Sequence, residues 1–331
     1  MPNRALVLSG GGSRGAFEVG AADYLINDAG LDFQVIAGVS TGALNAVMLA
    51  QGRGPDGLRA QLAALKDLWF GIKSADDIYT TRFLGKVLAF VLKDSIYSSK
   101  PVRQKIQQHV VPERLRGSGR ELRIGAVGLE TGDYHAIDQR NPDVRAWALA
   151  SASIPLLFPP VQIGGESAVD GGIRNVTPLE DAFDALKALP PAADGAADEL
   201  YVALASPLDV APVATRWTTG LKVAERAVEV LVNEVFREDL SYAIAINRSV
   251  RAYGDMRRRC AGQAAELQAL DAMPFRPPKY RAVRIRTILP ERAYSETLEF
   301  DPRKIREAFA AGRAAAQTPL DEDGLEAAVR R

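Results

Sequence analysis

The chain alternates short apolar runs with longer stretches in which apolar positions recur at helical spacing. An apolar run of about four to eight residues, bounded by turn-forming residues, is typical of a strand covered on both faces. Three runs fit this pattern and predict strands at Ala5–Ser9, Phe33–Ala37 and Leu200–Ser206, and a further strand is expected at Ala282–Leu289. The run Phe33–Ala37 is expected to be buried.

Two pairs of short runs are each separated by a glycine-containing turn, which is typical of β-hairpins. One hairpin is expected to join Glu121–Glu130 to Tyr134–Asp138, and the other to join Val161–Ile163 to Glu166–Val169. The second hairpin leads directly into Asp170, which we expect at the tip of its strand.

Apolar residues spaced as on one helix face, together with helix start and stop signals, predict the helices. They are expected at about Ala16–Asp28, from Ala43 onward, and at Leu58–Gly71, Pro101–Leu115, Asp143–Ser153, Pro178–Leu189, Thr218–Arg251, Ala261–Leu270 and Ile305–Ala316. The helix at Pro101–Leu115 is expected to be interrupted near Pro112, and Thr218–Arg251 is expected to be one long helix or two. Strands that alternate with helices favour an α/β fold, here three layers, α/β/α, with a mainly parallel central sheet.

The same pattern predicts the domain organisation. We expect a single domain over residues 1–317, with its motifs in a core at 5–180 and a helical C-terminal part at 200–317. Residues 318–331 are expected to form a polar tail.

Composition narrows the class of protein. Hydrophobic residues make up 47% and charged residues 25%, which is typical of a soluble globular chain. Lys+Arg and Asp+Glu both number 41, so no net charge favours nucleic acid as a partner. The single cysteine, Cys260, excludes an internal disulfide and a cysteine-based metal site. We expect no metal and no cofactor.

No stretch of the sequence reads as a leader or a membrane span. The uncharged runs Phe33–Gly52 and Ala146–Gly165 are broken by a glycine turn and by prolines respectively. We therefore expect a cytoplasmic protein that contacts a membrane surface at most peripherally. The segment Arg82–Lys93 is apolar on most sides and mixed with cations. It is interpreted as a buried helix, a cap over an acyl pocket, or a lipid contact.

The turn Gly38-Val39-Ser40-Thr41-Gly42 lies between an apolar strand and a helix, the setting of a nucleophile elbow. Gly38 and Gly42 lack a Cβ, so strand and helix can approach closely around the turn. Ser40 would face the free N–H groups at the helix start. This pattern predicts that Ser40 is a catalytic nucleophile, with an ordinary glycine-rich corner as the alternative.

The first strand runs into a glycine-rich loop made of Gly10, Gly11, Gly12, Ser13, Arg14 and Gly15. The glycine spacing formally matches a dinucleotide fingerprint, but Asp32 precedes the second strand instead of following it, which disfavours nucleotide binding. Beside a nucleophilic serine, the N–H groups of such a loop could form an oxyanion hole. Arg14 is interpreted as a support of this loop or as part of a surface salt bridge.

A serine nucleophile needs a base, and only two histidines are present. His109 lies in a basic helical stretch and is expected at the surface, whereas His135 alternates along a strand and is expected to pack. A carboxylate can also take the serine proton when it lies in a desolvated pocket. Asp170, followed by Gly171 and Gly172, is therefore the favoured base.

With these motifs in order, the sequence resembles the patatin-like phospholipase family, in particular bacterial patatin-like acyl hydrolases. The resemblance rests on GGGSRG at Gly10–Gly15, GVSTG at Gly38–Gly42 and DGG at Asp170–Gly172, with ASASIPLLFPP at Ala150–Pro160 leading to the aspartate. One departure is Ser9, where many relatives carry an aspartate. The resemblance implies a Ser40–Asp170 dyad without histidine and a calcium-independent activity.

The resemblance also implies the function. It indicates a lipid acyl-ester hydrolase of phospholipase A or lysophospholipase type, acting through an acyl-enzyme, with a lipid or phospholipid ester as its partner. Storage polyesters and small esters stay open as substrates. The alternatives are a non-catalytic acyl-lipid-binding protein of the same fold and a nucleotide-binding oxidoreductase. The oligomeric state, the acyl chain and the positional preference are left open.

Overall fold

A computed structural model describes residues 1–81, 95–192, 195–209, 212, 220–272 and 281–330. The expected helix or cap at Arg82–Lys93 lies outside the described residues. The strands are β1 (Arg4–Leu8), β2 (Val35–Val39), β3 (Thr80–Thr81), β4 (Tyr97–Ser98), β5 (Glu121–Gly128), β6 (Tyr134–Ile137), β7 (Val161–Ile163), β8 (Glu166–Asp170), β9 (Asp198–Ala203) and β10 (Val283–Ile288).

The helices alternate with these strands along most of the chain. They are α1 (Gly15–Asp23), α2 (Thr41–Leu49), α3 (Gly54–Phe70), α5 (Lys100–His109), α6 (Pro112–Gly117), α7 (Val144–Ser151), α8 (Leu179–Ala188), α9 (Gly220–Arg259), α10 (Ala264–Asp271), α11 (Pro302–Ala315) and α12 (Glu322–Val329). In the described part of the chain, no helix combines the length and the apolar character needed to cross a membrane.

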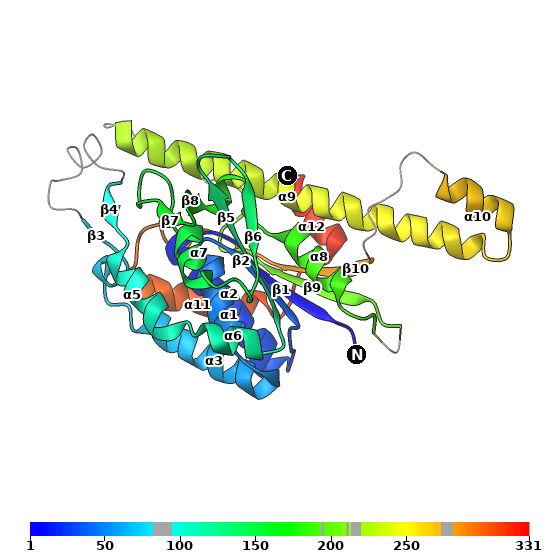
Figure 1. Ribbon diagram of the computed structural model, residues 1–331, viewed down its shortest axis with the longest axis horizontal. Helices are drawn as coiled ribbons and strands as arrows, with labels where there is room; N and C mark the ends of the chain where they lie inside the picture. The colour runs from blue at the N-terminus through cyan, green and yellow to red at the C-terminus, as the bar shows by residue number, and fades with distance from the viewer. Residues whose placement is uncertain (82–94, 193–194, 210–211, 213–219, 273–280, 331) are drawn as a thin grey trace.

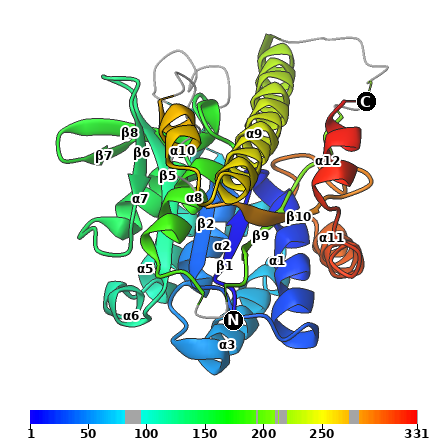
Figure 2. The same ribbon diagram turned by 90° about the vertical axis from the view of Figure 1, so that its right-hand side faces the viewer.

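The central sheet has the strand order β10-β9-β1-β2-β5-β8-β7, and β6 pairs with residues 124–127 of β5 along the edge opposite to β2 and β8. Neighbouring strands from β10 to β5 are parallel, whereas β8 is antiparallel to both β5 and β7. Helices cover both faces of this sheet (Figures 1 and 2). The expected three-layer α/β/α fold with a mainly parallel sheet is therefore confirmed.

The hydrophobic core is split in two by the sheet, because successive side chains of a strand point to opposite faces. Leu6 and Leu8 of β1 pack into the core formed with α1, α2, α3, α7 and α11. Ala5 and Val7 of the same strand pack into the core formed with α8, α9 and α12. The sheet is thus covered by apolar side chains on both sides, as expected for parallel strands.

Several element boundaries differ from expectation. β2 continues to Val39, so Gly38 lies within the strand. α3 starts at Gly54 instead of Leu58, with Pro55 in its first turn, where its missing N–H costs nothing. By contrast, the interruption expected near Pro112 is present, because the chain between α5 and α6 is extended at Val110 and Val111.

The polar tail expected at 318–331 is the main correction. Leu320 pairs with Thr287 of β10 through two backbone hydrogen bonds of 2.8 Å, and α12 follows. Leu325 and Val329 on one face of α12 are buried in the core shared with α8 and α9. Two apolar residues four apart on a helix share one face, so this short acidic segment is amphipathic despite its polar composition.

Candidate active site

Ser40 occupies the turn between β2 and α2 in a strained backbone conformation. Its φ is 57° and its ψ is −128°, a region that residues with a Cβ rarely adopt. A Cβ at Gly38 would overlap the backbone of Gly42, and a Cβ at Gly42 would overlap the carbonyls that end β1. Only glycine fits both positions, and the sharp turn between them lifts the serine out of the strand. This is the geometry expected of a nucleophile elbow.

The end of α7 holds the serine and the aspartate together. The N–H of Ser40 donates to Oγ of Ser151 at 3.0 Å. Two residues later, the carbonyl of Ser153 accepts a hydrogen bond from the N–H of Asp170 at 3.0 Å. The motif at Ala150–Pro160, noticed in the sequence only as an approach to the aspartate, therefore bridges the two residues of the expected dyad.

The sheet register brings Asp170 to the level of Ser40. β2 is parallel to β5, with Val39 opposite Gly125. β5 is antiparallel to β8, with Ala126 opposite Asp170. These two registers are one residue apart, and Ser40 directly follows Val39. β6 pairs with both Gly125 and Ala126 along one edge of β5, so β2 and β8 share the other edge and meet end to end. The serine and the aspartate therefore lie where these two strands meet.

Asp170 is 4% exposed, and its carboxyl group is only partly hydrogen-bonded. Its Oδ1 accepts a hydrogen bond from the N–H of Gly172 at 2.8 Å, whereas Oδ2 has no hydrogen-bond partner among the described residues. Burial raises the pKa of Asp170 to about 7, and the N–H of Gly172 and the nearby hydroxyl of Ser40 act in the opposite direction. The hydroxyl is thus close to the carboxylate, without an aligned hydrogen bond to Oδ2.

Contacts with other segments fix the glycine loop in place. The N–H of Gly10 donates to the carbonyl of Val176 at 3.2 Å, in the segment that follows the Asp170 motif. The N–H of Ser13 donates to the carbonyl of Thr297 at 2.9 Å. Both donors are therefore occupied, although sequence reasoning counted them among the residues of the oxyanion hole.

Two of the remaining N–H groups of the loop are free, and two are not. The N–H groups of Arg14 and Gly15 are occupied, because they close the short turn by donating to carbonyls of Gly11, Gly12 and Ser13. Among the described residues, the N–H groups of Gly11 and Gly12 have no acceptor. Of the six residues expected to form the oxyanion hole, these two therefore offer free donors, while the other four shape the loop.

Arg14 is almost fully buried and supports the loop. Its Nε donates to the carbonyl of Ser295 at 2.8 Å, and its Nη1 donates to Oγ of Ser206 at 3.0 Å. The neighbouring Ser13 hydroxyl lies 2.7 Å from that of Ser295. These contacts match the interpretation of Arg14 as a loop support, and they connect the loop to the segment after β10.

A buried carboxyl group that sequence reasoning missed lies under the loop. Glu18 of α1 is completely buried, and its oxygens are contacted by the hydroxyl of Ser9 at 3.3 Å and the side-chain amide of Asn45 at 3.0 Å. Burial raises the pKa of Glu18 well above its ordinary value. Oγ of Ser9 also accepts a hydrogen bond from the N–H of Ala205 at 2.9 Å. Asn45 in turn accepts one from the indole N–H of Trp69 at 2.9 Å.

Neither histidine replaces Asp170. His135 packs against Trp147, with ring centroids 5.1 Å apart and the ring planes tilted by 53°, and its Nε2 lies 3.0 Å from a carboxylate oxygen of Glu166. His109 ends α5 and is exposed. Neither is among the groups that shift the pKa of Asp170.

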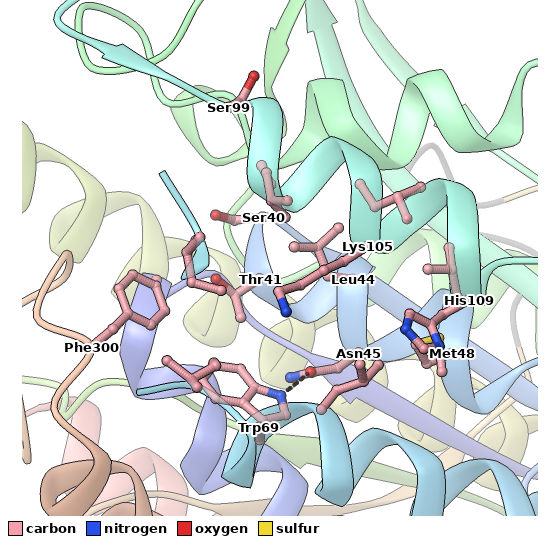
Figure 3. Close-up of a pocket in the computed structure, with 18 of the residues that line it drawn as sticks. Ser40, Thr41, Leu44, Asn45, Met48, Trp69, Ser99, Lys105, His109 and Phe300 are labelled. Atoms are coloured by element: carbon pink, nitrogen blue, oxygen red, sulfur yellow. Dashed lines mark hydrogen bonds between the residues drawn. The ribbon is translucent and has the colours of Figure 1, made fainter. Parts of the chain in front are cut away.

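An apolar cavity starts at Ser40 and Gly12 and extends between α2, α3 and α5 (Figure 3). Its apolar walls include Leu44, Met48, Leu65, Trp69, Ile106 and Phe300. Figure 3 shows Ser40 and Thr41 at one part of the cavity and Met48 and His109 at another. A long apolar group could therefore lie in the cavity with one end at the serine. Within the described residues, no group of three or more His, Cys, Asp or Glu side chains could hold a metal ion.

A strained serine beside a buried aspartate, with free N–H groups and an apolar cavity, is an arrangement that could carry out acyl-ester chemistry. A family model of patatin-like phospholipases matches residues 6–183, more than half of the chain. The chain belongs to the patatin-like phospholipase family. The resemblance seen in the motifs is thereby confirmed, and the patatin-like match contains the glycine loop, Ser40 and Asp170.

Solved structures similar to this patatin-like chain include VipD from Legionella pneumophila, at 12% identity and a TM-score of 0.41, covering 98% of this chain and 67% of that one. The type III effector ExoU matches at 12% identity and a TM-score of 0.38, covering 100% and 54%. The complex of SpcU with ExoU from Pseudomonas aeruginosa matches at 15% identity and a TM-score of 0.28, covering 82% and 69%. The chain thus spans between about half and about two thirds of these chains. No curated protein matches it.

Proposed function

We propose that this protein is a lipid acyl-ester hydrolase of phospholipase A or lysophospholipase type that uses a Ser40–Asp170 dyad. One observation carries the proposal. A serine with a strained backbone lies beside a buried carboxyl group that has a free oxygen, at the start of an apolar cavity. Family membership supports a lipid as substrate.

In the proposed reaction, Oγ of Ser40 attacks the ester carbonyl carbon while Oδ2 of Asp170 takes the hydroxyl proton. The carbonyl oxygen becomes an oxyanion that accepts hydrogen bonds from the N–H groups of Gly11 and Gly12. When the oxyanion collapses, the C–O bond to the alcohol breaks and Asp170 returns its proton to the leaving alcohol. A water molecule, deprotonated by Asp170, then cleaves the acyl-enzyme and releases the fatty acid.

The environment of Asp170 suits a general base without histidine. A carboxylate with its ordinary pKa is a weak base at neutral pH, and a base works best when its pKa lies near the operating pH. Burial raises the pKa of Asp170 to about 7, whereas the N–H of Gly172 orients the carboxyl group through Oδ1. Oδ2 is the oxygen left free to take the proton.

Labelling with a fluorophosphonate serine probe tests this proposal. Wild-type protein should be labelled, and Ser40→Ala and Asp170→Asn should each lose labelling while keeping wild-type circular dichroism. His135→Ala is the control, because its ring packs on Trp147 instead of facing the serine. Labelling that survives Asp170→Asn but fails in His135→Ala would keep the enzyme and overturn the proposed base.

The apolar cavity also favours a second candidate, a non-catalytic protein that binds an acyl lipid. The same probe separates the two functions. Wild-type protein that binds a fluorescent fatty acid but is never labelled would favour the binding protein and overturn the hydrolase. Release of fatty acid from a lysophospholipid, lost in Ser40→Ala, would favour the hydrolase.

A further inference from the structure

The wall of the cavity contributed by α5 carries a charge where an apolar side chain would be expected. Val102, Lys105, Ile106 and His109 line the cavity, at the spacing of one helix face. A helix face turned toward an apolar cavity normally carries only apolar side chains, because an unpaired charge there is costly. Lys105 and His109 break that rule on two successive turns.

The charged side chains that line the cavity are of one sign only. Among its described lining residues, Lys105 is the only lysine or arginine, and none is an aspartate or glutamate. Figure 3 shows the Lys105 side chain extending from α5 into the cavity, toward the part lined by Ser40 and Thr41. The lining of the cavity therefore offers a positive charge near the serine, and no aspartate or glutamate in that lining compensates it.

The amino group of Lys105 has no hydrogen-bond or ion-pair partner among the described residues. The N–H of Lys73 lowers the pKa of Asp77 most, and the charge of Lys105 also contributes to lowering it. Oδ2 of Asp77 accepts hydrogen bonds from the N–H groups of Lys73 and Ser74, at 2.7 and 3.3 Å. Asp77 is thus held by backbone groups and leaves the amino group of Lys105 unpaired.

We infer that Lys105 determines substrate specificity by binding a phosphate group that lies next to the scissile ester. The inference rests on the proposed hydrolase function and names the substrate class of that site, an acyl ester with an anionic phosphate headgroup. In a glycerophospholipid, the phosphate lies only a few bonds from the ester, so an ester held at Ser40 presents its phosphate nearby. The phosphate supplies the counter-charge that the cavity lacks, and the hydrogen bond to Lys105 is charge-assisted.

The test compares two substrates with the same acyl chain, lysophosphatidylglycerol and the neutral monoacylglycerol. We expect wild-type protein to prefer the phosphate-bearing ester in kcat/KM. Lys105→Met keeps most of the apolar stem without the charge and should lower the preference ratio about tenfold, equivalent to ~1.4 kcal/mol. Lys105→Arg keeps a cation and should retain most of the ratio. Lys100→Met removes the same charge from an exposed position of α5 outside the cavity, and should leave the ratio unchanged.

A ratio that Lys105→Met leaves unchanged, or changes no more than Lys100→Met, would overturn the inference. That result would mean that the Lys105 stem only covers apolar surface while its amino group stays in water. Inorganic phosphate provides a further arm. If it inhibits monoacylglycerol hydrolysis in wild-type protein but not in Lys105→Met, while wild-type protein shows no preference for lysophosphatidylglycerol, the site would bind free phosphate, and the headgroup assignment would be wrong.

Binding measured without turnover separates this inference from the proposed function. In a Ser40→Ala background, calorimetry should show tighter binding of lysophosphatidylglycerol than of monoacylglycerol, and Lys105→Met should remove the difference. Equal affinities in Ser40→Ala would overturn the role of Lys105 even if the protein is a hydrolase. Selective binding without any hydrolysis by wild-type protein would overturn the hydrolase and keep the anion preference.

Discussion

Ser151 accepts a hydrogen bond from the N–H of Ser40, so one hydroxyl at the end of α7 holds the backbone of the nucleophile turn. The donor is buried, and its strained residue has no other way to satisfy that N–H among the described residues. The same helix end binds the N–H of Asp170 through the carbonyl of Ser153. The distance between the proposed nucleophile and its base therefore depends on α7.

Replacing Ser151 by alanine should impair both activity and stability. The N–H of Ser40 would be left buried without a partner, at a cost of about 1–3 kcal/mol. We expect a slower rate of fluorophosphonate labelling and a lower midpoint of urea unfolding. Ser151→Thr keeps a hydroxyl and is the matched comparison. Normal labelling and stability in Ser151→Ala would show that the hydrogen bond does not hold the turn.

Much of the fold was predictable because its signals are local. The apolar runs at β1 and β2 are short and uninterrupted, and glycines at Gly38 and Gly42 mark a turn that few other residues could form. Parallel order follows once helices separate the strands. The elbow and the Asp170 motif could therefore be identified without coordinates, as candidates for one site.

The rest depends on contacts between distant segments. No local pattern indicates that Gly10 and Ser13 donate to Val176 and Thr297, which leaves Gly11 as one of two free donors in the loop. Glu18 could have been suspected as an acidic residue inside an otherwise apolar helix.

Activity should depend on the ionisation of Asp170. The carboxyl group must be deprotonated to take the proton of Ser40, and burial raises its pKa to about 7. With a neutral monoacylglycerol, kcat/KM should be constant above pH 7 and fall about tenfold for each pH unit well below it. A profile with its midpoint near pH 4 would show that Asp170 keeps an ordinary pKa. That result would contradict the prediction that burial raises this pKa.

The same raised pKa makes a prediction about stability. Between pH 3.8 and about 7, the folded protein keeps a proton on Asp170 that the unfolded chain releases. The free energy of unfolding therefore falls as pH rises through this window, and the full cost is present above pH 7. Asp170→Asn cannot ionise, so it should be more stable than wild type at pH 8, by about 2 kcal/mol or more.

Urea unfolding of both proteins at pH 8 and pH 4 is the measurement. The difference in stability should shrink at pH 4, where Asp170 of the wild type is protonated in the folded state and close to half protonated in the unfolded state. A difference that does not change with pH would indicate that the substitution acts through packing or hydrogen bonding at Oδ1.

Gly12→Ala should damage catalysis more than folding. Gly12 has a φ of +59°, and a Cβ there would overlap the carbonyl oxygen of Thr297, so the loop must shift. Moving one oxyanion donor costs roughly 3 kcal/mol in the barrier, about a hundredfold or more in kcat. Gly117→Ala, where a Cβ meets nothing within 4 Å, is the control. Single-turnover rates for a short-chain ester measure both variants, and equal rates would remove Gly12 from the oxyanion hole.

The last helix should contribute to the stability of the whole domain instead of acting as a dispensable tail. Leu325 is 1% exposed, and replacing a buried leucine by alanine costs about 2–5 kcal/mol. Leu325→Ala should therefore lower the midpoint of urea unfolding markedly. Asp323→Ala on the exposed face removes only a surface ion pair with Arg248 and should change stability by less than about 1 kcal/mol. If both variants unfold like wild type, α12 does not hold the sheet edge at β10, and the chain after residue 317 behaves as the sequence alone predicts.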